Sequence, residues 1–210
     1  MKMTCLEFYN KLESMNGEEY IKNFLIYSVS LVIAKVKPAA TITFNKCNED
    51  LYNNWCLTGK EFIKNINLKF IELRESNDSI IILIYNNDLL DKYINTEGNK
   101  EFLVSLGYSE NGAVIEYLIM LKKRYEEYNC PHELGVFLGI PLDDVKDFIN
   151  CNDKKCLLCG YWKVYNDCSS AKKIFKSYDE VKGYTVDSIF KGIEGNALVQ
   201  SIENNFNFYG

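Results

Sequence analysis

Two apolar runs in the first half of the chain carry the strongest strand signal. Leu68–Leu73 and Ser79–Tyr85 are separated by residues 75–78, which are Glu, Ser, Asn and Asp. Because these residue types favour turns, the two runs are predicted to form a β-hairpin. Residues 80–84 are all Ile or Leu and do not alternate with polar residues. This strand is therefore expected to be covered on both faces, at the centre of a sheet.

Apolar residues recur at helical spacing on both sides of this hairpin. The clearest segment is Ala113–Tyr128, which places one apolar face along its whole length. His132–Leu138 and Leu142–Ile149 are predicted to be two short helices, with Gly139 ending the first and Pro141 starting the second. Further helices are expected at residues 6–15, 20–27, 50–65, 89–94, 100–106 and 171–178, and further strands at 40–44 and 161–165.

These elements predict one α/β (or α+β) domain. We expect a small mixed sheet of about four strands surrounded by helices, because the hairpin is antiparallel while long helical stretches separate the other strands. A chain of 210 residues with 47% hydrophobic residues has enough apolar side chains for a core without disulfide or metal staples. The single globular domain is expected over residues 1–190. Residues 191–210, with a weak pattern and an Asn-rich end, are expected to be a loosely ordered tail.

Charge argues against nucleic acid as a partner. The net charge is -5, and no segment concentrates Lys and Arg into a basic stripe. Residues 131–149 resemble a helix-turn-helix, but the second helix would present Asp143, Asp144 and Asp147 to the phosphates of DNA. A DNA-binding role is therefore disfavoured.

The composition also indicates a cytoplasmic protein without a membrane segment. Residues 1–19 carry four Glu and lack the basic-then-apolar order of a signal peptide. The most apolar stretch, Phe24–Val36, is too short to span a bilayer. Eight cysteines in such a chain are expected to be reduced thiols.

Three motifs in the second half resemble a known family. They are Pro131-His132-Glu133-Leu134-Gly135, the Pro-x-x-Asp-Val-x-x-Phe-Ile segment of residues 141–149, and Gly160-Tyr161-Trp162-Lys163-Val164-Tyr165. In this order and spacing they resemble domain of unknown function 3793, found mainly in anaerobic Firmicutes, and Lys37-Pro38-Ala39 resembles a further element of it. Where the family has a His-Cys-Ala-Pro-like stretch before that element, this chain has Ser28–Leu31. The resemblance implies no activity and no cofactor.

The first candidate site is the segment Cys130, His132 and Glu133. His132 is the only histidine of the chain, and an imidazole near a thiol and a carboxylate can transfer protons or bind a metal. Neighbouring residues of a helix point in different directions, however. The alternative interpretation is that Pro131 and Glu133 simply open a helix.

The second candidate is a group of cysteines at 151, 156, 159 and 168. Cys151, Cys156 and Cys159 have the C-x4-C-x2-C spacing of the first three ligands of a plant-type iron–sulfur site, and Cys168 would be the fourth. Four thiolates can equally bind zinc. The alternative is a set of scattered reduced thiols, because Cys159 is expected to enter a strand.

The third candidate is the predicted strand at 161–165. Alternation places Tyr161, Lys163 and Tyr165 on one face, where two aromatic rings beside a cation can bind a flat or anionic ligand. The alternative is that Lys163 covers an aromatic edge while Trp162 fills the core.

Two functional hypotheses follow from these candidates. The sequence contains no Gly-rich phosphate loop, nucleophile elbow or H-E-x-x-H motif. In the first hypothesis the protein is a non-catalytic accessory protein, whose His132 helix and 160–165 strand form a pocket for a small-molecule or protein partner. In the second it is a small redox or metal-dependent protein that uses Cys130 and His132 or the four cysteines. A site requires residues 131–133, Lys163 and Cys159 to come within ligand reach.

Overall fold

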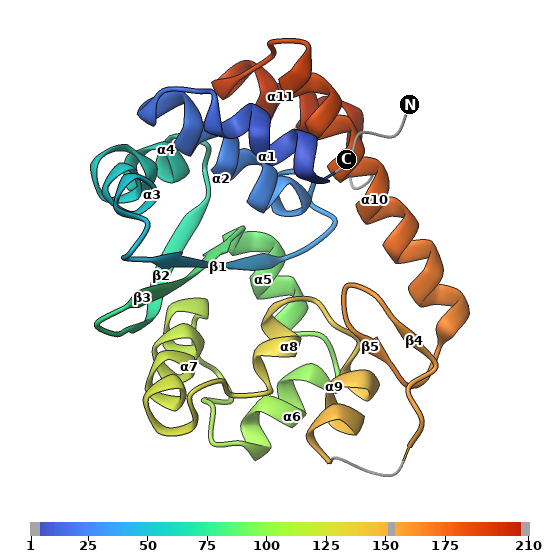
Figure 1. Cartoon of the computed structure of the whole chain (residues 1–210). Coiled ribbons are helices and arrows are strands. Elements are labelled where there is room, and N and C mark those ends of the chain that lie inside the picture. Colours follow the sequence, from blue (N-terminus) through green and yellow to red (C-terminus); the bar gives the residue numbers. More distant parts are fainter. Residues whose placement is uncertain (1–4, 151–153, 207–210) are drawn as a thin grey trace.

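The computed structural model of the chain describes residues 5–150 and 154–206. Helices and strands alternate unevenly, with a strand-rich first half and a helical second half (Figure 1). In chain order the elements are α1 (Cys5–Glu13), α2 (Gly17–Ile33), β1 (Ala39–Asn45), α3 (Glu49–Asn54), the π-helical turn η1 (Trp55–Gly59), α4 (Lys60–Asn65), β2 (Lys69–Glu75), β3 (Ser79–Tyr85), α5 (Asn87–Ile94), α6 (Asn99–Ser105), α7 (Val114–Tyr128), α8 (Leu134–Phe137), α9 (Leu142–Ile149), β4 (Leu158–Cys159), β5 (Lys163–Val164), α10 (Cys168–Phe190) and α11 (Gly195–Phe206).

The main sheet has the order β1-β3-β2 among the described residues. The predicted hairpin is present as β2 and β3, and Ile82 at the centre of β3 pairs with Ile42 of β1 and Glu72 of β2. Both pairings are antiparallel, so the sheet is not mixed as the sequence predicted. The physical reason is that β3 is inserted between β1 and β2, which run parallel to each other. The helices α3 and α4 join β1 to β2 as in a split β-α-β unit.

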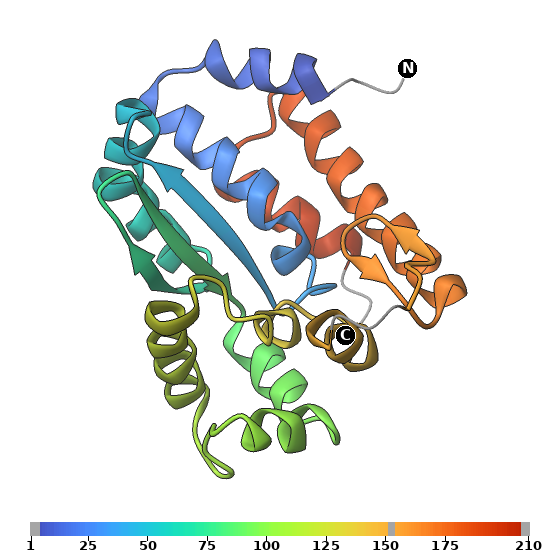
Figure 2. The same ribbon diagram turned by 60° about the horizontal axis from the view of Figure 1, so that its bottom comes forward.

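The sheet separates two apolar cores, which confirms an α/β fold with a small sheet surrounded by helices. On one face, Ile80, Ile82 and Ile84 pack with side chains of α2, α10 and α11. On the other, Leu83 and Tyr85 pack with side chains of α5, α7 and α8. Figures 1 and 2 show α2 and α10 on one side of the sheet and α7 on the other. The apolar run of β3 is thus covered on both faces, as its lack of alternation predicted.

The predicted strand at residues 161–165 is instead a short hairpin. β4 pairs with β5 through Leu158–Val164 and Cys159–Lys163, and residues 160–162 form the turn. Gly160 is required there because a Cβ atom at this position would lie 2.3 Å from the ring of Phe175. The strand ends at Val164 because the backbone N–H of Tyr165 donates to the carboxylate of Asp144 rather than to another strand.

The C-terminal segment also differs from the expected loose tail. α10 is 23 residues long, well beyond the predicted helix at 171–178. α11 then folds back, and Leu198, Val199 and Ile202 are buried against the core that includes α2. Three apolar residues on one face are enough to dock this helix, although the segment as a whole is polar.

The corner after α2 and the middle of α10 bring two lysines together. The Lys182 ammonium donates to the carbonyl of Tyr27 and lies 4.1 Å from the centre of the Tyr27 ring. Burial, and then the nearby charge of Lys37, lower the pKa of Lys182 to about 7. Burial lowers the pKa of Lys37 to about 8.

We expect replacement of Ile202 by alanine to lower the free energy of unfolding by about 2–4 kcal/mol, because a fully buried side chain leaves a cavity. Urea unfolding measures the change. The exposed Gln200→Ala serves as the matched control on the same helix. An effect of Ile202→Ala no larger than that of the control would contradict the docking of α11.

The low pKa of Lys182 predicts that stability rises with pH. Between about pH 7 and 9 the unfolded chain keeps a proton that folded Lys182 releases, so raising the pH favours the folded state. We expect Lys182→Met to flatten this rise, measured as urea midpoints from pH 6 to 9. Lys176→Met, on the exposed face of the same helix, is the control and should keep the wild-type slope. Equal slopes in wild type and Lys182→Met would refute the prediction.

Candidate functional site

A pocket of about 260 Å³ lies between the 130–132 segment, α8, α9 and the β4–β5 hairpin. Its inner wall is apolar and includes Leu138, Val145 and Trp162. Its lining also includes Cys130, His132, Tyr161 and Lys163, which are candidates named from the sequence. The three motifs at residues 131–135, 141–149 and 160–165 therefore meet at one cavity. A mostly apolar pocket with a few convergent polar groups is the usual form of a small-molecule site.

The pocket depends on the carboxylate of Asp144. This residue lies in the first turn of α9 and is 3% exposed. One carboxylate oxygen accepts from the indole N–H of Trp162 at 2.8 Å. The other accepts from the backbone N–H groups of Tyr165 and Asn166 and from the Asn166 side chain, at 2.9–3.0 Å. Asp144 thus fixes the hairpin against α9 and holds Trp162 as a wall of the pocket.

His132 and Lys163 both line the pocket, and each lies against the ring of Phe148. The imidazole and phenyl rings are 5.1 Å apart between centroids and meet edge to face at 70°. The Lys163 ammonium lies 5.7 Å from the centre of the same phenyl ring. Both polar side chains are exposed, so their hydrogen-bonding groups are accessible to a ligand. Lys163 does cover an aromatic ring, as the alternative interpretation held, but it does so at a pocket.

Glu133 is directed away from this pocket. It is 3% exposed, forms an ion pair with Arg124 and accepts a hydrogen bond from the hydroxyl of Tyr108 at 3.2 Å. Burial, and next the charge of Glu133, raise the pKa of that hydroxyl. Glu133 lines a second cavity of about 240 Å³ beside Arg124 and Tyr128. Of the four proposed catalytic candidates, Cys130, His132 and Lys163 line the 260 Å³ pocket, and Cys130 and His132 also line the second cavity with Glu133. The contacts of Glu133 with Arg124 and Tyr108 anchor the segment that carries Cys130 and His132.

The sequence predicted that Tyr161, Lys163 and Tyr165 share one face of a strand, but the structure separates Tyr165 from the other two. Tyr161 and Lys163 line the pocket, whereas Tyr165 is held through its backbone by Asp144. The hydroxyl of Tyr161 donates to Asp179 of α10 at 2.9 Å, and its ring lies 4.9 Å from that of Tyr178. Tyr161 therefore connects the pocket to α10.

The cysteine candidates lie in separate places where they are described. The thiol of Cys156 donates to the carbonyl of Leu158, Cys159 is exposed in β4, and Cys168 begins α10. In residues 5–150 and 154–206, no three His, Cys, Asp or Glu side chains gather as a metal site. Cys151 lies outside the described residues, so the iron–sulfur or zinc alternative stays a prediction.

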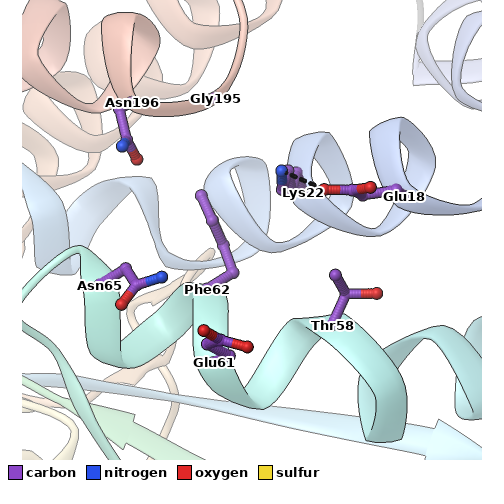
Figure 3. Close-up of a pocket in the computed structure, with 8 residues that line it drawn as sticks. All are labelled: Glu18, Lys22, Thr58, Glu61, Phe62, Asn65, Gly195 and Asn196. Carbon is purple, nitrogen blue, oxygen red and sulfur yellow. Dashed lines mark hydrogen bonds and ion pairs between the residues drawn. The ribbon is translucent and has the colours of Figure 1, made fainter.

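A third cavity, of about 330 Å³, was not foreseen from the sequence. Figure 3 shows its lining side chains, which come from α2, the η1–α4 region and the start of α11. Lys22, the one cation among these lining residues, is paired with Glu18 at 2.5 Å. No single motif could have revealed this cavity, because its residues range from Glu18 to Asn196. Its open, polar lining makes it a weaker candidate than the pocket at Lys163.

We expect Asp144→Ala to lower the free energy of unfolding by about 3 kcal/mol or more, because it leaves the indole and backbone donors without an acceptor. Urea unfolding measures the loss. The adjacent, exposed Asp143→Ala is the control and should cost less than about 1 kcal/mol. Equal losses in the two variants would disprove the role of Asp144.

Comparison with known proteins places the chain in a family. None of the described helices is both long and apolar enough to cross a lipid bilayer. No curated protein and no solved structure matches the chain. The model of the family described as "Protein of unknown function (DUF3793)" matches residues 25–199, a span that includes the whole pocket at Lys163 and its Asp144 support. The chain belongs to the DUF3793 family.

Proposed function

We propose that the protein is a non-catalytic accessory protein that binds a small molecule with a flat apolar body and an anionic group. The observation that carries this proposal is the convergence of His132 and Lys163 on one apolar pocket. Trp162 and Val145 offer an apolar wall to the body of the ligand. Lys163 and the protonated form of His132 offer charge-assisted hydrogen bonds to a carboxylate or similar anion.

The surroundings of His132 favour binding over catalysis. A catalytic imidazole is normally oriented by a carboxylate or carbonyl that fixes its tautomer. Here the His132 ring packs against Phe148, and the neighbouring carboxylate of Glu133 is engaged by Arg124 and Tyr108. The exposed rings of Phe148 and Tyr161 at the pocket suit stacking against an aromatic ligand.

The cytoplasm is part of the same proposal. Eight cysteines suit a reducing compartment. The net charge of -5 favours a small anionic ligand bound by a local pair of cationic groups over a polyanion bound by a broad basic surface.

The single histidine provides a direct test. His132 lines both this pocket and the 240 Å³ cavity, whereas Lys163 lines only this pocket, so a Lys163 variant tells the two places apart. The imidazole Cε1–H gives a single histidine signal in an NMR spectrum. We expect phenylacetate and indole-3-acetate to shift it saturably, and the uncharged phenylacetamide to bind more weakly. Lys163→Gln should lower the affinity for the two carboxylates by about fivefold, which is equivalent to roughly 1 kcal/mol and typical of an exposed ion pair.

The control for this titration is Lys155→Gln, an exposed lysine before the hairpin that does not line the pocket. It should leave every affinity unchanged. The proposal fails if neither acid shifts the histidine signal in wild type, or if Lys163→Gln binds the acids as tightly as the control does.

A further inference from the structure

A second cluster of polar groups lies on α10, on the far side of Tyr161 from the pocket. The hydroxyl of Tyr178 donates to the carbonyl of Val36 at 3.4 Å, which brings the corner after α2 against α10. Tyr178 and Lys182 are four residues apart and share one helix face. Lys37, the residue after Val36, therefore comes close to Lys182. This is the Lys37-Pro38-Ala39 element singled out in the sequence, which the pocket does not use.

The corner is held tightly enough to define a site. Gly139 has a φ of +78°, and a Cβ atom there would lie 2.7 Å from the ring of Pro38. The α8–α9 turn therefore closes directly on the corner, so the backbone that carries Lys37 has little freedom. Lys182 is fixed by the Tyr27 carbonyl and ring.

Neither lysine has an acidic partner within 4 Å among the residues that the structure describes. The carboxylate of Asp179, on the same helix, instead accepts from the hydroxyl of Tyr161. The two ammonium groups are close enough for the charge of Lys37 to lower the pKa of Lys182. Burial and repulsion therefore disfavour the two ammonium charges here and shift both lysines towards the uncharged amine.

The end of α2 offsets only part of this charge. The C-terminus of a helix carries roughly half a negative charge, and Lys37 follows α2 closely. Half a charge does not balance two ammonium groups, so the pKa values of both lysines stay low. A bound oxyanion would supply a counter-charge and favour the protonated form of both lysines. Both lysines and Tyr27 keep part of their surface open to solvent, and the Tyr161 side chain is 41% exposed, so an anion can enter.

We propose that Lys37 and Lys182 form a binding site for a phosphate group, with Tyr27 and Tyr161 beside it. The site does not rest on the function proposed for the pocket at Lys163. A phosphate group can come from free phosphate or from a phosphomonoester, whose organic part would pack against the exposed tyrosine rings.

The test is calorimetric titration of the full chain with inorganic phosphate and with phenyl phosphate, at constant ionic strength adjusted with sodium chloride. We expect saturable binding of both probes to wild type, and a loss of at least about tenfold in affinity in Lys37→Met and in Lys182→Met. Tighter binding of phenyl phosphate would assign a phosphomonoester, and equal affinity would assign the phosphate group alone. Lys176→Met, on the exposed face of α10, is the control and should bind as wild type does.

A second measurement uses only the wild-type protein, so it does not depend on the folding of a variant. Acetic anhydride acylates unprotonated amines, and mass spectrometry locates the modified lysines. Phosphate should protect Lys37 and Lys182 from acylation while Lys176 stays reactive. The proposal is overturned if wild type shows no saturable binding of either phosphate probe, if the two variants bind them as tightly as the control, or if phosphate protects neither lysine.

Discussion

The second half of the molecule depends on the hydrogen bonds that the buried carboxylate of Asp144 accepts. A two-residue strand pair such as β4–β5 has too few backbone hydrogen bonds to be stable alone. Asp144 supplies acceptors to the indole of Trp162 and to the backbone beyond β5, and α9 thereby organises the hairpin. The pocket at Lys163 exists because this one residue joins two sequence motifs.

Two acidic residues of these motifs, Glu133 and Asp144, are engaged in structural contacts, whereas the basic side chains stay exposed. The carboxylate of Glu133 pairs with Arg124 and accepts a hydrogen bond from Tyr108. The carboxylate of Asp144 accepts hydrogen bonds from the hairpin. His132 and Lys163 remain exposed at the pocket, and Lys37 and Lys182 remain without an acidic partner in the described chain. An acidic protein therefore presents basic side chains at two places. Tyr161 lies between them, with its ring at the pocket and its hydroxyl on α10.

Much of the fold was predictable because it follows from local patterns. Turn residues at 75–78 indicated the hairpin, and the unbroken run of residues 80–84 indicated a strand covered on both faces. The apolar face of α7 and the Gly139–Pro141 break between α8 and α9 were equally local. The prediction of a mixed sheet was wrong because the order of strands depends on β3 entering between β1 and β2, which no periodicity records. The docking of α11 was missed because three apolar residues in a polar segment matter only beside α2.

For the candidate site, the sequence by itself singled out the candidate side chains, and the tertiary structure decided where each of them lies and what it contacts. The motifs named His132, Glu133 and Lys163, but their spacing left open whether Glu133 served the site or the scaffold. Only its burial against Arg124 decided this, since an ion pair joins residues by distance in space. The proximity of Lys37 and Lys182 could not be predicted for the same reason. Lys37 and Lys182 are 145 positions apart in the chain, and only the packing of α10 against the end of α2 brings their charges together.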